Sequence, residues 1–299
     1  MITAKNLTKE FDGFLALDNV SFEIEDGTVF GLVGSNGSGK STLLRLISGV
    51  LYPDSGIVGI DQIPSFDNPV VKSQIIFLGD TPYFFNQSTL KEMAKFYASM
   101  YPNFSYDTFE EMLTVFPLDK SKKISSFSKG MQRQASLVLA IASRPRYLLM
   151  DEAFDGLDVV MRRSLSNIIS KSIEETNMTV VIASHNLREL EEITDHIALI
   201  HKGKLIRNGK IDDLCSNIHK VQVVFENIPE LSVFEKLNVM KTERTGSVIQ
   251  MVVRGEKAEI MEFINSLSPV FSECIEPSLE EVFIYELEVS GYDVKNILE

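Results

Sequence analysis

The segment from Gly34 to Ser41 constrains this chain more than any other stretch of its 299 residues. It reads Gly-Ser-Asn-Gly-Ser-Gly-Lys-Ser, which fits the pattern G-x-x-x-x-G-K-[ST] at every position. The apolar run from Thr28 to Val33 before it is typical of a buried strand, and the leucine-rich segment 43–47 after it has the spacing of a helix face. A strand, a glycine-rich loop and a helix in this order predict a phosphate-binding loop.

The residue types of this loop match the chemistry of a polyphosphate. Glycines let the backbone wrap closely enough for several N–H groups to point at phosphate oxygens, and the helix start adds its positive end. Lys40 is expected to reach the β- and γ-phosphates, and the Ser41 hydroxyl to bind Mg²⁺. The predicted phosphate-binding residues are Gly34, Ser35, Asn36, Gly37, Ser38, Gly39, Lys40, Ser41 and Thr42.

A pair of acidic residues follows a second buried strand. The apolar run Tyr147–Met150 ends in Asp151 and Glu152. An aspartate at such a strand end holds Mg²⁺ in phosphate-loop enzymes. Glu152 is placed to orient and deprotonate an attacking water, a role worth roughly 10²–10⁴ in rate. Two acids after a strand could equally be a solvated loop, but the phosphate loop favours the catalytic interpretation.

Composition excludes several functions. The net charge of -13 disfavours nucleic-acid binding and direct adhesion to an anionic membrane, so any anionic ligand needs a local binding site. No apolar run approaches the ~20 residues of a membrane-spanning helix, and the first residues lack the apolar core of a secretory signal. Cys215 and Cys274 are far apart and are expected to be free thiols, as in a reducing cytosol.

The order of elements predicts an α/β fold with a mostly parallel core sheet. Alternating apolar residues before residue 25 predict N-terminal antiparallel strands, and residues 86–135 are expected to be mostly helical. Strand Thr179–Ala183 continues the alternation of strands and helices. After Ser216 the pattern changes to β-α-β-β-α-β, with a helix at Pro229–Leu237. We therefore expect a nucleotide-binding domain over 1–215, with a helical subdomain at about 86–135, and an accessory α+β domain over 216–299.

Further residues give the chain a resemblance to the ATP-binding cassette (ABC) proteins. Phe127–Met131 resembles the LSGGQ signature, with Ser128 and Gly130 matching. Gly156-Leu157-Asp158 is similar to the family's D-loop, and His185 after a strand is similar to its switch histidine. Phe11 resembles the aromatic residue that stacks on adenine, with Phe14 as a rival. These motifs occur in the family's order over residues 1–215.

The resemblance implies an ATPase that uses Mg²⁺. Two such domains close head to tail over two ATP molecules, so that the signature of one copy faces the γ-phosphate bound by the other. Glu152 and His185 would be catalytic, and Asp158 would lie at the dimer interface. The implied partners are a second nucleotide-binding domain and a separate transmembrane permease, at the cytoplasmic face of the cell membrane. The implied signature contacts are Ser128, Lys129, Gly130, Met131 and Gln132.

The sequence departs from the family at four positions. Lys129 and Met131 replace signature residues, and Ala153 stands where a proline commonly follows the catalytic glutamate. Asp80 occupies the place of a glutamine that links the ATP site to the permease, so we expect it to serve coupling and the metal. Asp80, the variant signature and the aromatic run Tyr83–Phe85 resemble a bacterial exporter branch linked to antibiotic and cell-envelope stress.

Three alternatives remain at this stage. Soluble cassette ATPases of translation or DNA repair more often carry two cassettes or a long coiled-coil insertion, and this sequence has neither. A non-catalytic nucleotide-binding regulator would not need both Glu152 and His185. A guanine-nucleotide enzyme would carry an Asn-Lys-x-Asp motif, which is missing from the sequence. The transported molecule, and the choice between homodimer and heterodimer, are not specified by the sequence.

Overall fold

The chain forms two compact units, Met1–Asn208 and Gly209–Glu299, in a computed structural model. It describes residues 1–152, 154, 157–227 and 229–289. The expectations for Ala153 and Gly156 therefore fall outside the described residues. Each unit has a sheet of its own, and we describe them separately.

A six-stranded sheet in the order β10-β9-β3-β8-β7-β6 forms the centre of the first unit. The pairs β3–β8, β3–β9, β7–β8 and β6–β7 are parallel. β3, β7 and β8 are buried along their whole length, as expected of parallel strands covered on both faces. The strands are Val29–Val33 (β3), Ile75–Leu78 (β6), Tyr147–Asp151 (β7), Thr179–Ser184 (β8), His196–His201 (β9) and Lys204–Lys210 (β10).

The N-terminal strands form a separate antiparallel sheet in the order β2-β1-β4-β5. Asp12 and Gly13 make the turn between β1 and β2, and both have positive φ. Buried residues of this sheet share one hydrophobic core with the buried leucines of α1 and with residues of the central sheet. The elements are Ile2–Phe11 (β1), Phe14–Ile24 (β2), Lys40–Ile47 (α1), Ser55–Ile60 (β4) and Ile63–Pro64 (β5).

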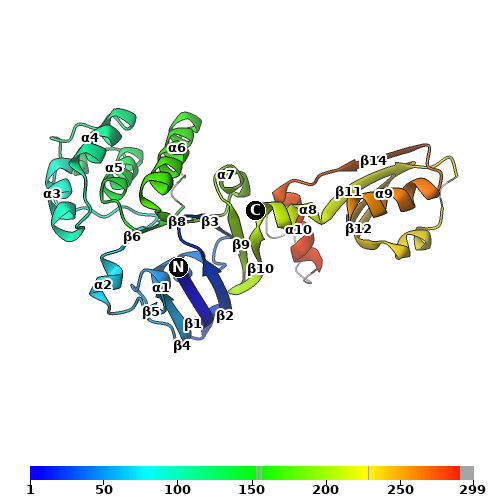
Figure 1. Ribbon diagram of the computed structural model, residues 1–299, viewed down its shortest axis with the longest axis horizontal. Helices are drawn as coiled ribbons and strands as arrows, with labels where there is room; N and C mark the ends of the chain where they lie inside the picture. The colour runs from blue at the N-terminus through cyan, green and yellow to red at the C-terminus, as the bar shows by residue number, and fades with distance from the viewer. Residues whose placement is uncertain (153, 155–156, 228, 290–299) are drawn as a thin grey trace. The chain divides into compact units, whose positions relative to one another are not determined.

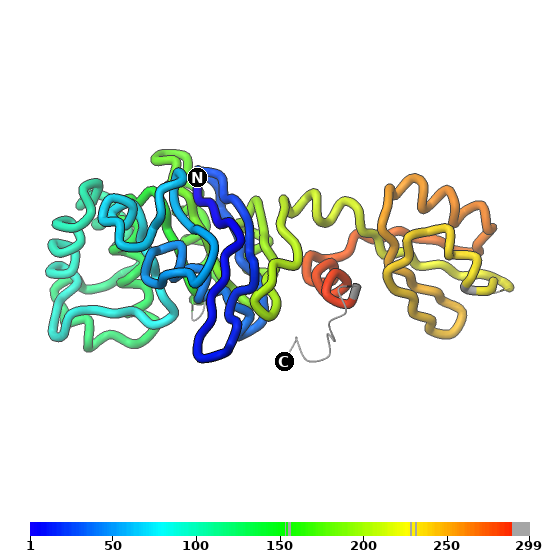
Figure 2. The backbone as a smooth tube through the Cα atoms, turned by 90° about the horizontal axis from the view of Figure 1, so that it is seen from below, coloured from blue at the N-terminus to red at the C-terminus, as the bar shows by residue number. Residues whose placement is uncertain are grey.

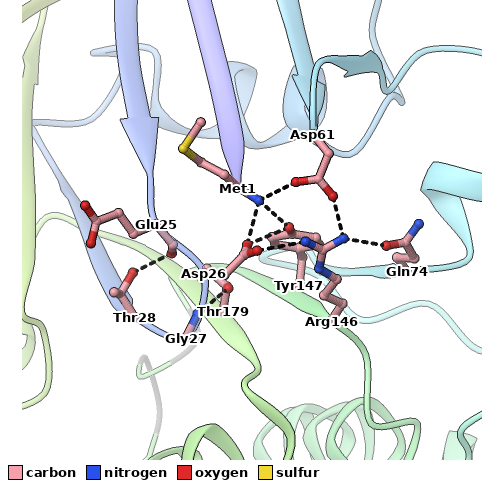
Figure 3. Close-up of polar contacts among 10 residues, drawn as sticks. All are labelled: Met1, Glu25, Asp26, Gly27, Thr28, Asp61, Gln74, Arg146, Tyr147 and Thr179. Carbon is pink, nitrogen blue, oxygen red and sulfur yellow. Dashed lines mark hydrogen bonds and ion pairs between the residues drawn. The ribbon is translucent and has the colours of Figure 1, made fainter.

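A polar network joins the two sheets of this unit at the start of β1 and β7 (Figure 3). The Met1 ammonium lies 2.7 Å from Asp26 Oδ1 and 2.8 Å from Asp61 Oδ1. Arg146 donates to the same two carboxylates, at 2.7 Å and 2.6 Å. The Tyr147 hydroxyl donates to Asp26 at 2.7 Å. Two cations and two carboxylates thus neutralise one another beside the starts of β1 and β7.

Helices α3, α4 and α5 lie together to one side of the core sheet (Figure 1). Thr89 begins α3 by a capping box with Glu92, and Ser105 caps α4 by accepting from Thr108 N. None of the described helices is long and apolar enough to cross a membrane. The remaining helical bounds of this unit are Pro69–Lys72 (α2), Leu90–Met100 (α3), Tyr106–Val115 (α4), Ile124–Ser126 (η1), Lys129–Ala142 (α5), Val159–Thr176 (α6) and Leu187–Glu191 (α7).

The second unit is built on an antiparallel sheet in the order β12-β13-β11-β14. Ile260 and Ile264 of α9 pack against Val221 and Met251 on one face. On the other face α10 packs over Val252, and Figure 2 shows α10, in red, beside the yellow-green α8. The elements are Ile211–Ser216 (α8), Ile218–Val224 (β11), Leu231–Lys236 (η2), Asn238–Thr245 (β12), Val248–Arg254 (β13), Lys257–Ser266 (α9), Phe271–Ile275 (β14) and Leu279–Val289 (α10).

The predicted fold class is confirmed: a mostly parallel core sheet, antiparallel N-terminal strands, a helical segment and a C-terminal α+β unit. Two details differ from expectation. The segment expected as a helix at Pro229–Leu237 is the 3-10 helix Leu231–Lys236. The first unit ends at Asn208 rather than at residue 215, because α8 contacts β11 and α10 of the second unit.

Candidate functional site

The phosphate loop links β3 to α1 with a backbone that requires glycine at two points. Gly39 has φ 111°, and a Cβ there would lie 2.6 Å from the Ala16 carbonyl oxygen. At Gly34 a Cβ would lie 2.2 Å from the Ile200 carbonyl oxygen. Side chains at these positions would push the loop off the strands beneath it. The buried Ser38 hydroxyl has no hydrogen-bond partner among the described residues, so it is left available to a ligand.

Lys40 is buried at the centre of the site, with 5% of its side chain exposed. Its ammonium donates to the carbonyl oxygens of Gly34 at 2.6 Å and Ser35 at 3.2 Å. Glu152 Oε1 lies 3.7 Å away. Burial lowers the pKa of Lys40, and the negative charges of Glu152 and Asp151 oppose that shift. The Lys40 ammonium is therefore held by the loop carbonyls at a position where it can attract an anion that enters the loop.

Asp151 offers a carboxylate that fits a divalent cation. It ends β7, is 3% exposed, and its Oδ1 has no hydrogen-bond partner among the described residues. Burial raises the pKa of Asp151, whereas the Ser41 hydroxyl and the charge of Lys40 lower it, and the nearby Asp80 charge raises it. A buried carboxylate oxygen and a serine hydroxyl are both oxygen donors of the kind that Mg²⁺ prefers. Among the described residues, no group of three His, Cys, Asp or Glu side chains is placed to bind a metal ion.

Glu152 connects Lys40 to His185. The His185 Nδ1 lies 3.0 Å from Glu152 Oε2, while the other carboxylate oxygen faces Lys40. The backbone of Glu152 has φ 51°, a conformation that non-glycine residues rarely adopt and that is often found at functional sites. Its N–H donates to the Ala183 carbonyl oxygen at 2.9 Å, which ties the turn to the end of β8. The Glu152 carboxylate therefore lies between the phosphate-loop lysine and the His185 ring.

A cavity of about 350 Å³ gathers most of the predicted site. Phe11 and Phe14 flank the β1–β2 turn at its rim, 41% and 62% exposed. The Lys9 ammonium lies 5.3 Å from the centre of the Phe11 ring, whereas Phe14 is the more open of the two. Both rings remain candidates for stacking on a base. The cavity is lined by Phe11, Phe14, Ala16, Asn36, Gly37, Ser38, Gly39, Lys40, Ser41, Thr42, Asp80, Asp151 and Glu152.

Asp80 lines this cavity from the loop after β6, but its carboxylate is held by another element. Arg133 Nη2 donates to Asp80 Oδ1 at 2.8 Å and to the Asp80 carbonyl oxygen at 3.0 Å. Arg133 belongs to α5, the helix that begins in the signature segment. Asp80 is thus placed at the site, as expected, and is also an ion-pair partner of the signature helix.

The signature residues do not line the cavity of their own chain. Ser128 caps α5 by accepting from Met131 N at 3.2 Å, and the Gln132 amide donates to the Phe127 carbonyl oxygen at 3.2 Å. Ser128 and Lys129 are exposed at the helix start. Asp158 likewise caps α6 by accepting from Met161 N at 2.8 Å. These groups present ordered helix starts to the exterior rather than to Lys40.

Sequence reasoning missed Arg133 as a site residue. Nothing local marks it, because its partner Asp80 is 53 positions away in the chain. It also missed the ion pair between Arg162 Nη1 and Glu189 Oε1, at 2.9 Å, which connects α6 to α7. Neither pair has a sequence signal, because each joins residues that are far apart in the chain.

Comparisons with known proteins identify the family. A family model described as "ABC transporter" matches residues 17–155. The ABC transporter ATP-binding protein YtrB of Bacillus subtilis (strain 168) is 31% identical, over 95% of this chain and 97% of that protein. The bacitracin transport ATP-binding protein BcrA of Bacillus licheniformis is 29% identical, over 72% of this chain and 71% of that protein.

A solved structure adds a dimeric reference. It is the dimeric structure of a post-hydrolysis state of the ATP-binding cassette MJ0796 bound to ADP and Pi. The match has a TM-score of 0.63 and 25% identity, and covers 71% of this chain and 99% of that chain. A cassette about as long as the first unit thus makes up nearly the whole of that protein.

Proposed function

This chain belongs to the ABC transporter ATP-binding proteins, and we propose that it powers an exporter through a separate transmembrane subunit. As an ABC ATPase it binds and hydrolyses ATP. In our proposal two copies, or one copy and a related subunit, close head to tail over two ATP molecules. Hydrolysis then opens the pair, so that a chemical step becomes a movement of the permease.

The described residues divide the chemistry among themselves in this proposal. The loop N–H groups and Lys40 bind the β- and γ-phosphates. Glu152 orients and deprotonates the attacking water, supported by its contact with Lys40 on one side and His185 on the other. His185 holds the Glu152 carboxylate in position and lies close to the transferred phosphate. Phe11 or Phe14 stacks on the adenine.

Mg²⁺ fits the donors present. We propose that Ser41 and Asp151 hold it, because the orphaned Asp151 oxygen lies in the same cavity as the Ser41 hydroxyl. Held there, Mg²⁺ would neutralise negative charge on the β- and γ-phosphates. Asp80 faces the same cavity and is proposed to act through metal-bound water, since an ionised carboxylate accepts hydrogen bonds but cannot donate them.

The signature is proposed to act on the ATP of the other copy. Ser128 and the N–H groups at the start of α5 are ordered and exposed, and they lie outside their own cavity. A helix start with its free N–H groups attracts an anion such as a γ-phosphate. Asp158 starts α6 in the same exposed manner and is proposed to lie at the dimer interface.

Export is proposed from two relatives and the variant residues. BcrA is named for bacitracin transport, and a linearmycin resistance ATP-binding protein, LnrL, is 30% identical over 73% of this chain. Asp80 and the variant signature Ser128–Met131, which resemble those of a bacterial exporter branch, also favour export. We propose that the chain works at the cytoplasmic face of the cell membrane, bound to its permease, and does not bind nucleic acid.

The observation that supports hydrolysis most strongly is the position of Glu152, 3.7 Å from buried Lys40 and 3.0 Å from His185. The experiment compares Glu152→Gln with wild type in steady-state turnover of MgATP and in ATP binding. An amide cannot take the proton, so turnover should fall by roughly 10²–10⁴ while ATP affinity stays within a few fold.

Glu110→Gln serves as the matched control, because Glu110 is an exposed glutamate that pairs with Lys120 on the helical segment. It should hydrolyse ATP as wild type does. Wild-type turnover in Glu152→Gln would remove Glu152 from the mechanism. The export part is tested separately, by asking whether the chain co-purifies with a multispan membrane protein rather than with ribosomes or DNA.

A further inference from the structure

One ion pair connects the phosphate cavity to the signature helix of the same chain. Arg133 Nη2 reaches both the carboxylate and the main-chain carbonyl of Asp80. The Arg133 side chain is 19% exposed, and the Asp80 side chain is 66% exposed. Because Arg133 donates to the backbone of the loop as well as to the carboxylate, the contact links the loop after β6 to α5 at two atoms.

The two ends of the pair serve different sites. Asp80 lines the cavity that holds Lys40 and Asp151. Arg133 lies on α5 five residues after Ser128, the residue that caps this helix. Gln132, next to Arg133, donates to the carbonyl oxygens of Ile124 and Phe127 and so fastens the helix start to the turn before it. The loop of Asp80 is therefore linked through Arg133 to the Ser128 end of the helix.

We propose that Arg133 is a positioning residue that makes the signature helix respond to nucleotide in the chain's own site. The inference rests on the proposed head-to-tail dimer, in which that signature completes the site of the other copy. The Asp80–Arg133 pair is then the route by which occupation of one ATP site prepares the second.

Electrostatics gives the pair this sensitivity. A triphosphate brings several negative charges beside Asp80, and like charges at short range repel each other. Arg133 cannot lose its proton in a protein, so it neutralises Asp80 whether or not nucleotide is present. An ion pair this exposed contributes little to stability. Its geometry can therefore change when a bound nucleotide changes the local charge.

The test uses the full chain and four forms: wild type, Arg133→Gln, Arg133→Lys and Arg144→Gln. Arg144 follows the C-terminal end of α5 and pairs with Glu175 at 3.3 Å, away from the cavity, so it controls for loss of an arginine near this helix. Amide hydrogen exchange is measured with and without a non-hydrolysable ATP analogue. ATP binding and the Hill coefficient for ATP hydrolysis are measured in parallel.

In wild type the analogue should change the exchange of residues 128–134, and the Hill coefficient should approach its limit of about 2 for two coupled sites. Arg133→Gln should abolish the change at 128–134 and bring the Hill coefficient towards about 1, with ATP affinity altered by no more than about threefold. Arg133→Lys keeps the cation and should restore part of both effects. Arg144→Gln should match wild type.

Three results would overturn the inference: an unchanged exchange response in Arg133→Gln, the same loss in Arg144→Gln, or no response at 128–134 in wild type that has bound the analogue. Wild type that binds no nucleotide would instead contradict the proposed function itself. The two failures are therefore distinguishable in one data set.

Discussion

The two units of this chain use their sheets differently. In the first unit, parallel strands β3, β7 and β8 end together, and their ends carry the phosphate loop, Asp151–Glu152 and His185. In the second unit, the neighbouring strands β12 and β13 are antiparallel and are joined directly by the Thr245–Val248 hairpin. Parallel strands place several chain segments at one edge, where a site can be assembled from distant residues.

The polar groups of the two units differ in the same way. In the first unit Lys40 is buried, and Ser38 and Asp151 have unpartnered polar atoms that face a cavity. In the second unit Lys220 pairs with Glu281 and Lys241 with Glu288 on the face covered by α10. These groups of the first unit surround the cavity, whereas the two lysines of the second unit are paired with glutamates. The following experiments test whether this division holds.

The largest expected effect is on stability in the second unit. Ile249 is fully buried in the core under α9, so Ile249→Ala should cost roughly 2–5 kcal/mol through lost contacts and a cavity. ATP affinity should not change, because the nucleotide site lies in the other unit. Calorimetry and nucleotide binding check both points, with Leu149→Ala in the core of the first unit as the counterpart. A loss of ATP affinity in Ile249→Ala would mean that the units are not independent.

The next largest effect is on binding in the first unit. Lys40→Ala removes the buried cation and its hydrogen bonds to phosphate, which should weaken ATP binding roughly 10- to 100-fold. Lys220→Ala removes a lysine that pairs with Glu281 in the second unit and should leave ATP affinity as it is. Isothermal titration with MgATP measures both. Equal losses in the two variants would contradict the assignment of nucleotide binding to the phosphate loop.

The smallest effect is a pH dependence of the first unit. Burial alone would raise the pKa of Asp26, but hydrogen bonds from the Met1 ammonium, Tyr147 and Arg146 lower it to about 2. The unfolded value is about 3.9. Because the folded pKa is depressed, this stabilisation is present above about pH 4 and is lost as the pH falls towards 2.

Asp26→Asn should therefore flatten the acid limb of the stability curve of the first unit between about pH 4 and 2. The matched variant Asp119→Asn changes an aspartate of the helical segment outside this network and should leave the curve as in wild type. Urea unfolding at a series of pH values measures both. An acid limb in Asp26→Asn as steep as that of wild type would show that the network of Figure 3 contributes no pH-dependent stability.

How far the sequence predicts this molecule depends on how local each feature is. The phosphate loop and Asp151–Glu152 are readable because neighbouring residues alone determine a strand that ends in a functional turn. The sequence does not predict the left-handed backbone of Glu152, because the N–H of that residue is held by Ala183 of β8. It also does not predict that Asp151 Oδ1 is buried without a hydrogen-bond partner among the described residues, because burial depends on the packing of the whole unit. The predicted boundary at residue 215 places nearly all of the segment Ile211–Ser216 (α8) in the first domain, because the sequence of so short a helix does not show which core it packs against.

Pairings over long sequence distances are the other limit. Met1 and Tyr147 are 146 positions apart, and Asp80 and Arg133 are 53 apart. Any charged surface residue is a candidate for such a pair until the fold brings two of them together. The position of Asp80 after a strand can be predicted from the sequence, whereas its partner Arg133 cannot.

In the proposed function, the first unit is sufficient for two copies of the chain to associate when ATP binds. The most direct measurement is sedimentation velocity of Glu152→Gln with and without MgATP, in the full chain and in a chain ending at Lys210, the last residue of β10. MgATP should double the mass of both forms, and Lys40→Ala should abolish the doubling. A shortened chain that is folded by circular dichroism yet stays monomeric with MgATP, while the full chain dimerises, would contradict it.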